Sequence, residues 1–391
     1  MARAATMTDS RLPFPDDDAR AHSARVAAHV REEIERAGGF IAFARYMDLV
    51  LYAPGLGYYA AGARKLGPAG DFVTAPELTP LFGAALAREL AVALGTTQAR
   101  EIVELGAGSG ALATSVLNAL ADAKASPSRY LILEPSPELR ARQQATLETQ
   151  AARSGARVEW IERLPDAIDG VVVMNEVLDA IAPHVVARRG DRWYERGVAL
   201  VDGRFAWDER PLDDARLLAL ARARFPDEGD YTSEVNPAAE ALVATIGRRL
   251  RAGAMLVVDY GFARAEYYHP QRASGTLVGH FRHRVHDDPF LWPGLSDLTA
   301  HVDFTAIADA GERAGLHVAG FSTQASFLLG CEILERLREV GAPEGVDYAR
   351  AAAAVQKLLS PAEMGELFKV LLLARGEVPP FLALRNMTER L

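Results

Sequence analysis

The stretch Ile102-Val103-Glu104-Leu105-Gly106-Ala107-Gly108-Ser109-Gly110-Ala111-Leu112 decides the fold of this chain of 391 residues. An apolar run ends in an acid, three glycines follow at alternate positions, and an alanine- and leucine-rich segment comes after them. Glycine lets the backbone turn sharply and approach a ligand closely. Glu104 lies where the predicted strand ends, ready to face a cation or a ribose hydroxyl. The stretch therefore predicts a strand, a turn with a ligand site, and a helix.

Three interpretations of this turn are open. The dinucleotide-binding pattern is G-x-G-x-x-G with an acid about 20 residues later, whereas this chain has G-x-G-x-G preceded by Glu104. That form resembles the first motif of class I S-adenosylmethionine (SAM) methyltransferases. A dinucleotide site and a plain strand-to-helix turn are the alternatives.

A second acid follows the next predicted strand. Residues 130–133 form an apolar run, and Glu134 comes directly after it. Because open α/β sheets bind ligands at the carboxyl ends of their strands, Glu134 is predicted to accept hydrogen bonds from the ribose hydroxyls of SAM. The alternative is an acid of a helix start, since Pro135-Ser136-Pro137-Glu138 is typical of a helix N-terminus.

Composition argues against several classes of function. The net charge is −9, with no basic block or basic–aromatic ladder, so nucleic-acid binding is not expected. Cys331 is the only cysteine, which excludes an internal disulfide and a multi-cysteine zinc site. Apolar runs are too short for a membrane span, and residues 1–10 lack a signal-peptide core. We therefore expect a cytoplasmic protein.

The order of patterns along the chain predicts its organisation. Helices are predicted over residues 23–36, 41–47, 80–94 and 242–250, strands over residues 171–174 and 255–260, and a β-hairpin near residues 184–210. We expect a disordered tail over residues 1–22, a helical cap with cofactor-covering loops over 23–98, an α/β core over 99–325 with insertions at about 184–235 and 262–303, and a helical region over 326–391.

Several segments, taken in order, resemble one family. They are Tyr58-Tyr59, Gly70-Asp71-Phe72-Val73-Thr74-Ala75-Pro76-Glu77, the glycine turn, Met174-Asn175-Glu176-Val177-Leu178-Asp179-Ala180, Ser233-Glu234-Val235-Asn236, Val258-Asp259-Tyr260-Gly261, Leu298-Thr299-Ala300-His301-Val302-Asp303-Phe304, and Met364-Gly365 with Leu367-Phe368-Lys369-Val370. Over residues 25–380 the chain resembles the MidA family of SAM-dependent methyltransferases. That family includes a mitochondrial complex I assembly factor described as a protein arginine methyltransferase.

The resemblance implies an α/β fold of the class I (Rossmann-like) methyltransferase type, with about seven strands and SAM as the cofactor. It implies cofactor-binding roles for Asp71, Thr74, Glu104, Gly106, Gly108, Gly110, Glu134 and Asn175. Glu104 would lie near the methionine ammonium group or a bridging water. Asp71 and Thr74 would either bond the amino-acid end of SAM or stabilise their own turn.

The predicted acceptor side follows the strand over residues 171–174, with Asn175 and Glu176 directly after it. If residues 176–179 form a helical turn, Glu176 and Asp179 share one face and can hold a guanidinium group bidentately. Because a guanidinium stays protonated at neutral pH, orienting it matters more than a strong base. In the alternative, Glu176 contacts the cofactor and Asp179 makes a local cap or ion pair. By analogy with arginine methyltransferases, His301 is a third catalytic candidate.

Other features carry alternatives of their own. Tyr58 and Tyr59 are predicted either to line the acceptor pocket or to belong to the core. His280, His283 and His286 have no cysteine beside them, so we expect polar residues and no metal site. Residues 327–329 and 370–373 are apolar and would suit either a homodimer surface or the core.

The sequence thus predicts a SAM-dependent N-methyltransferase, whose acceptor is a protein arginine. The resemblance suggests a respiratory-complex subunit as the partner. A small-molecule methyltransferase and a non-catalytic assembly factor with the same fold are the alternatives.

Overall fold

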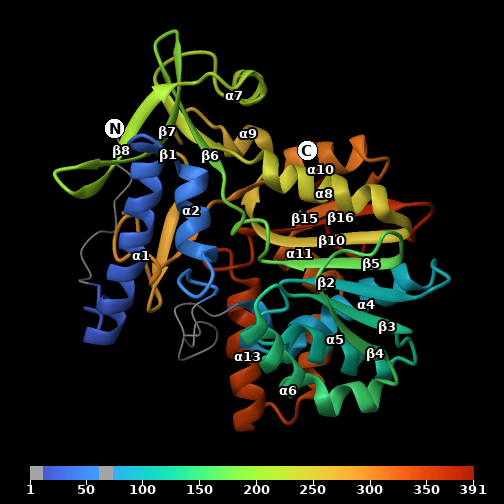
Figure 1. Cartoon of the computed structure of the whole chain (residues 1–391). Helices are drawn as coiled ribbons and strands as arrows, with labels where there is room; N and C mark the ends of the chain where they lie inside the picture. The colour runs from blue at the N-terminus through green and yellow to red at the C-terminus, as the bar shows by residue number, and fades with distance from the viewer. Residues whose placement is uncertain (1–11, 61–73) are drawn as a thin grey trace.

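The computed structural model describes residues 12–60 and 74–391, with the side chains of residues 149–153 left aside. Figure 1 shows a large sheet covered by helices on both faces, beside a smaller lobe built around helices α1 (Asp17–Arg36) and α2 (Phe43–Tyr52). Within the described residues, no helix combines the length and the apolar character that crossing a bilayer requires.

The large sheet has the strand order β15-β16-β10-β5-β2-β3-β4, and β14 pairs with β10. Strands β2, β3, β4, β5 and β10 run parallel, whereas β16 is antiparallel to both of its neighbours. The chain proceeds from β2 towards one edge and from β5 towards the other, so the topological switch point lies between β2 and β5. These strands are β2 (Glu101–Leu105), β3 (Arg129–Leu133), β4 (Arg157–Ile161), β5 (Ile168–Asn175), β10 (Leu250–Phe262), β14 (Val302–Asp303), β15 (His317–Thr323) and β16 (Phe368–Arg375).

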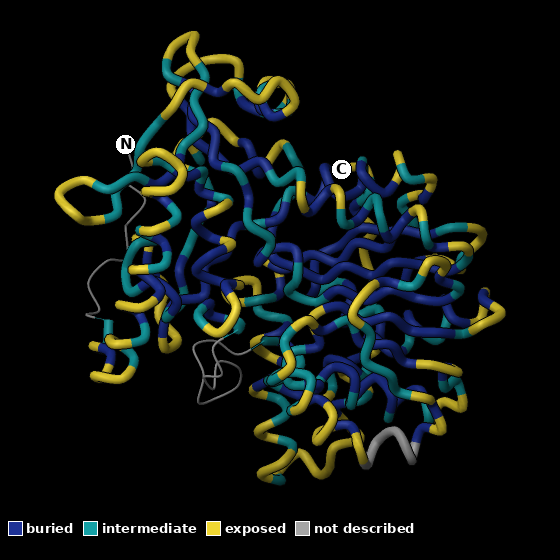
Figure 2. Tube along the Cα trace, viewed as in Figure 1, coloured by how far each residue is buried: buried dark blue, intermediate teal, exposed yellow. Residues whose placement is uncertain are grey.

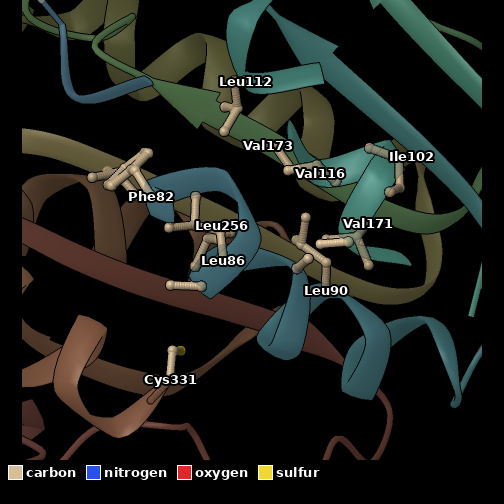
Figure 3. Close-up of a cluster of buried hydrophobic side chains, with 14 of the residues drawn as sticks. Phe82, Leu86, Leu90, Ile102, Leu112, Val116, Val171, Val173, Leu256 and Cys331 are labelled. Atoms are coloured by element: carbon tan, nitrogen blue, oxygen red, sulfur yellow. The ribbon is translucent and has the colours of Figure 1, made fainter. Parts of the chain in front are cut away.

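Both faces of this sheet are buried, as the dark strands in Figure 2 show. Successive strand residues point to opposite faces, so Ile102 packs on one side and Val103 on the other. Figure 3 shows the first side, where Phe82, Leu86 and Leu90 pack against the sheet. That side carries α3 (Ala75–Leu78), α4 (Pro80–Leu94), α5 (Ala111–Asp122), α6 (Pro137–Ser154), α11 (Gln324–Gly330), α12 (Ile333–Glu339) and α13 (Val346–Leu359); the other carries α8 (Pro237–Arg249) and α10 (Phe304–Arg313).

The smaller lobe is built on a second sheet in which β7 pairs with β1, β6 and β8, and β6 pairs with β9. A three-stranded sheet, β12-β11-β13, lies in the insertion after β10. The elements are β1 (Phe40–Ala42), β6 (His184–Arg189), β7 (Arg192–Val201), β8 (Arg204–Pro211), α7 (Ala215–Arg224), β9 (Tyr231–Val235), α9 (Arg264–Tyr267), β11 (Val278–Phe281), β12 (Arg284–His286), β13 (Asp297–Thr299) and the 3₁₀ turn η1 (Thr388–Arg390). The predicted hairpin is therefore confirmed as part of a larger sheet.

Two predictions for the N-terminal region are wrong in their boundaries. The predicted tail over residues 1–22 overlaps α1, which begins at Asp17 because the side chain of Asp16 caps it by accepting a hydrogen bond from the Ala19 N–H at 2.9 Å. The start of the helix predicted over residues 41–47 is two residues too early, because Ile41 and Ala42 pair with β7 and the helix begins at Phe43.

The prediction of a wholly helical C-terminal region is also wrong. Residues 368–375 form β16 between β10 and β15, so the core continues well past residue 325. The apolar run 370–373 is buried on both faces, and the side chains of Phe327 and Leu328 are buried as well. Core packing therefore accounts for these buried residues, as the second of the two interpretations predicted.

Candidate functional site

The carboxyl ends of the parallel strands gather most of the predicted site residues. Gly106 follows β2, Glu134 follows β3, Asn175 ends β5, and Asp259 lies near the end of β10. Because β2, β3, β5 and β10 are parallel neighbours, these ends meet at one edge of the sheet, beside the switch point.

The glycine turn has the backbone that its sequence requires. Gly106, Gly108 and Gly110 have φ angles of 66°, 55° and 86°, in the left-handed region that favours glycine. A Cβ on Gly106 would lie 3.1 Å from Cγ2 of Val177, so the turn also packs closely against the loop after β5. Gly110 is the N-cap of α5, whose first N–H groups face the turn. The three glycines leave the backbone of this turn open to close approach by a ligand.

Glu104 is buried under this turn. Its Oε2 atom accepts a hydrogen bond from the Tyr130 hydroxyl at 2.7 Å. Burial raises the pKa of Glu104 to about 7, and the nearby charge of Glu134 adds to the shift. The two acids therefore lie close enough to interact, one on each side of the turn.

Glu134 is held by a network that also includes the glycine turn. Its Oε1 accepts from the Ser136 N–H at 2.9 Å, and its Oε2 accepts from the Gln143 side-chain amide at 3.1 Å. The same amide donates to the Gly108 carbonyl at 2.9 Å, and the indole N–H of Trp160 donates to the Gln143 oxygen. Burial raises the pKa of Glu134. Its carboxyl group is thus fixed in position at the tip of β3.

The loop after β5 brings the predicted acceptor-side acids together, but not on a helix. Residues 176–179 form a bend, and Glu176 has a φ angle of 53°, so the conditional prediction of a helical turn is wrong. The two carboxyl groups are still close enough for the charge of Asp179 to affect Glu176. Burial, with the charge of Asp179 second, raises the pKa of Glu176 to about 8, and burial raises the pKa of Asp179 to about 6.

Asn175 lies between the two predicted subsites. Its side-chain N–H donates to Glu176 Oε1 at 3.2 Å. Its Oδ1 atom is buried and accepts no hydrogen bond from the described residues. A buried acceptor without a donor is costly, so this amide fits a position beside a ligand that donates to it.

Helix α3 bridges the two sides of the site. Thr74 precedes it as the N-cap, and the Ala75 N–H donates to Glu176 Oε1 at 3.3 Å. At the other end, Glu77 accepts a hydrogen bond from the Ser109 hydroxyl of the glycine turn. The predicted cap segment therefore covers this edge through residues 74–77. Asp71 lies outside the described residues.

Sequence reasoning assigned no role to Tyr52, whereas it considered Tyr59 for the acceptor pocket. The Tyr52 hydroxyl donates to the Ala180 carbonyl at 2.8 Å, its ring stacks on that of Tyr59 at 5.5 Å, and the Tyr59 hydroxyl donates to Asp297 Oδ1 at 2.9 Å. Tyr58 belongs to the core of the smaller lobe, as its alternative interpretation predicted. No local sequence pattern could have predicted that Tyr52 and Asp297 lie near this loop, because segments far apart in the sequence bring them there.

His301 lies beside the end of β10. Its ring packs edge-on against Tyr260 at 4.9 Å and stacks on Phe262 at 5.2 Å. Burial lowers the pKa of His301 to about 4, so the ring is neutral at pH 7. It also lines a cavity of about 20 Å³ with Glu234 and Asp303, large enough for one water. His301 therefore packs on the aromatic rings at the end of β10.

Two other histidines of the insertion belong to its small sheet. His286 contacts the Ser296 hydroxyl at 3.0 Å, and His280 pairs in the small sheet with Asp297 and Val285. In the part of the chain that the structure describes, no group of three or more His, Cys, Asp or Glu side chains is arranged to hold a metal ion.

The electrostatics of this edge favour a cation. Glu104, Glu134, Asp179 and Asp259 are buried there, and Glu176 is partly buried. Burial raises the pKa of each of them. A positively charged ligand lowers those pKa values and stabilises the ionised carboxylates. The arrangement suits the sulfonium and ammonium groups of SAM, and the glycine cradle and the Asn175 acceptor fit it too.

These shifts predict how the stability of the ligand-free protein depends on pH. The folded pKa values of Glu176, about 8, and Glu104, about 7, lie above the ordinary value of 4.5. Between pH 6.5 and 8 the unfolded chain has therefore lost protons that the folded protein keeps, and the free energy of unfolding falls as pH rises, by roughly 1.4 kcal/mol per pH unit for each such proton.

Thermal or urea unfolding between pH 6.5 and 8 measures this slope. The window starts at the ordinary histidine pKa of 6.5, so the opposite contribution of the buried histidines fades above about pH 7, where the slope is read. Glu176→Gln is expected to make the slope shallower. A stability that rises with pH in this window would contradict the assignment of these carboxyl groups as protonated in the free protein.

Comparison with known proteins agrees with this geometry. Residues 85–322 match a family described as an S-adenosyl-L-methionine-dependent methyltransferase. A crystal structure from Burkholderia thailandensis, bound to S-adenosyl-homocysteine, is similar to this chain with a TM-score of 0.92 and 48% sequence identity, over 97% of this chain and 100% of that one.

Curated relatives cover most of the chain as well. A Caenorhabditis elegans protein named mitochondrial protein arginine methyltransferase NDUFAF7 homolog is 30% identical over 331 residues, 78% of this chain and 76% of its own length. The human protein of that name is 29% identical over 383 residues, 87% of this chain and 81% of its own. The chain belongs to the MidA family of SAM-dependent methyltransferases, and SAM is its cofactor.

Proposed function

We propose that this methyltransferase transfers the methyl group to a guanidinium nitrogen of an arginine in a partner protein. The observation that carries the proposal is the pair Glu176 and Asp179, two interacting carboxyl groups on the loop after β5. The Oδ1 atom of Asp179 is buried and accepts no hydrogen bond from the described residues. Carboxylates that can take up a planar, bidentate cation suit a guanidinium group better than a neutral acceptor.

The names of the relatives support the same acceptor. The proteins from Caenorhabditis elegans and from human are called protein arginine methyltransferases, and each covers more than three quarters of this chain. The aromatic rings of Tyr52 and Tyr59, which contact the acceptor-side loop and Asp297, add surfaces on which a flat cation can stack.

SAM supplies, when bound, a methyl group on a sulfonium centre that is open to attack by a nitrogen lone pair. The residues of the chain have three tasks. The glycine turn and Glu134 hold the cofactor, Glu176 and Asp179 orient the guanidinium so that one nitrogen is in line with the S–C bond, and α3 covers this edge against water. When the N–C bond forms, the S–C bond breaks and one N–H proton leaves, and a carboxylate of this pair can accept that proton.

Mass spectrometry of acceptor peptides tests the proposal. The purified chain is incubated with SAM and a library of arginine-containing peptides, and a matched library in which lysine replaces arginine is the control. Methylation on guanidinium nitrogens, absent from the lysine set, is the expected result. Methylation of small molecules alone, or SAM binding with no transfer to either library or to proteins of a cell extract, would overturn it and favour a small-molecule enzyme or a non-catalytic assembly factor.

A further inference from the structure

The carboxyl group of Asp259 is buried beneath the loop that carries the acceptor-side acids. It lies near the end of β10, directly after the apolar run 254–258, which is buried on both faces. Its Oδ2 atom accepts hydrogen bonds from three consecutive backbone N–H groups, those of Val177, Leu178 and Asp179, at 3.2, 2.9 and 3.3 Å. Its Oδ1 accepts from the Tyr260 N–H at 2.9 Å.

These bonds hold a backbone that is not stable alone. Glu176 has a φ angle of 53°, which a residue with a side chain adopts only when its surroundings impose it. On one side the Glu176 N–H donates to the Val258 carbonyl at 2.9 Å. On the other side Asp259 takes up the next three N–H groups, so residues 176–179 are tied to β10 at every amide.

We infer that Asp259 is a positioning residue for methyl transfer, whose carboxylate fixes the loop so that Glu176 and Asp179 face the transferable methyl group. The inference rests on the proposed role of this loop. Asp259 has no free oxygen towards the acceptor, since both of its oxygens are occupied by backbone N–H groups. In an asparagine at this position, one of the two oxygens is replaced by an NH₂ group. That group cannot accept a hydrogen bond from a backbone N–H, so some of these hydrogen bonds would be lost.

Amide hydrogen exchange tests the mechanical part without any acceptor. In the wild-type protein, the amides of residues 177–179 lie in a bend. They are nevertheless expected to be protected from hydrogen exchange to the same degree as the amides of β10. In Asp259→Asn their exchange is expected to speed up by about tenfold or more, which corresponds to the loss of roughly one hydrogen bond. Unprotected amides in the wild-type protein would overturn the inference even if the variant failed to fold.

Ligand binding tests the catalytic part. Sinefungin carries an ammonium group where SAM carries its methyl sulfonium. The ratio of the protein's affinities for sinefungin and for S-adenosylhomocysteine therefore reports on the carboxylates near the methyl position. Asp259→Asn is expected to reduce that preference by about tenfold and to change S-adenosylhomocysteine affinity by less than about threefold. An equal loss for both ligands, or for neither, would mean that Asp259 serves the fold alone.

Glu101→Gln is the matched control. Glu101 is also a buried acid of the large sheet, and it accepts a backbone hydrogen bond from the Asp169 N–H at 3.0 Å at the opposite edge. Its replacement is expected to lower stability while leaving the ligand preference unchanged. Neither hydrogen exchange nor ligand binding uses a methyl acceptor. Both measurements therefore still test the role of Asp259 if the acceptor proves not to be an arginine.

Discussion

Glu176→Gln is expected to lower kcat for methyl transfer to an arginine peptide by about 10²–10³-fold. The side chain keeps its shape but loses the charge that orients the guanidinium cation and that favours loss of its proton. Radiolabelled methyl transfer at saturating SAM measures the effect. The dissociation constant of S-adenosylhomocysteine is expected to change by less than about threefold, because this residue serves the acceptor.

The control for this variant is Asp48→Asn. Asp48 is an exposed acid of α2 whose carboxylate pairs with Arg45 at 2.9 Å. It lies close enough to Tyr52 to affect the pKa of that hydroxyl, yet it does not contact the loop after β5 through any described hydrogen bond. Its replacement is expected to leave kcat within about threefold of the wild-type value. A Glu176→Gln enzyme with near wild-type kcat would remove Glu176 from catalysis.

Glu134→Gln is expected to weaken S-adenosylhomocysteine binding by about 100-fold. Two charge-assisted hydrogen bonds to the ribose hydroxyls, at about 1.5 kcal/mol each, amount to roughly 3 kcal/mol. The network around Gln143 already fixes this carboxyl group, so little ordering opposes binding. Isothermal titration calorimetry measures the change.

Two controls separate the ribose role from a role in the start of α6. Glu138 lies in the first turn of that helix, and Glu138→Gln removes a helix-terminal charge while leaving Glu134 in place. Its affinity for S-adenosylhomocysteine is expected to stay within about threefold of the wild type. An analogue that lacks the 2′-hydroxyl is expected to lose less affinity in Glu134→Gln than the natural ligand does. An equal loss of affinity for both ligands would mean that Glu134 stabilises the start of α6 and does not bind the ribose.

The sequence predicted the strand, the glycine turn and the helix on the cofactor side because these elements are local. A strand, three glycines with positive φ angles and a helix follow one another within residues 101–122, and Glu134 ends the neighbouring strand. In a parallel sheet, residues at strand ends meet whatever the tertiary detail. The fold class followed from the same reasoning.

The acceptor side was predicted less completely because its contacts are distant in sequence. Asp259 holds residues 177–179 across about 80 positions, and the Tyr59 hydroxyl contacts Asp297. A spacing of three between acids suggested a helical turn, but the hydrogen bonds to Asp259 impose a bend. Asp259 stands as an acid within the apolar run 255–260 and in the family segment Val258-Asp259-Tyr260-Gly261, but neither signal predicts which amides it holds.

The C-terminal strand was missed for a related reason. Residues 368–375 are apolar on both faces, so they have neither the period of an amphipathic helix nor that of a half-buried strand. Their place between β10 and β15 is fixed by pairing over more than 100 residues with Leu256 and its neighbours. Long-range pairing of this kind leaves no mark on local composition.

A crystal structure of this chain with S-adenosylhomocysteine tests the central claim most directly. We predict the ligand on the glycine turn between β2 and α5, with its ribose hydroxyls within hydrogen-bond distance of the Glu134 carboxylate and its sulfur facing the Glu176–Asp179 loop. A ligand bound elsewhere, or bound at this turn with its sulfur directed away from that loop, would contradict the account.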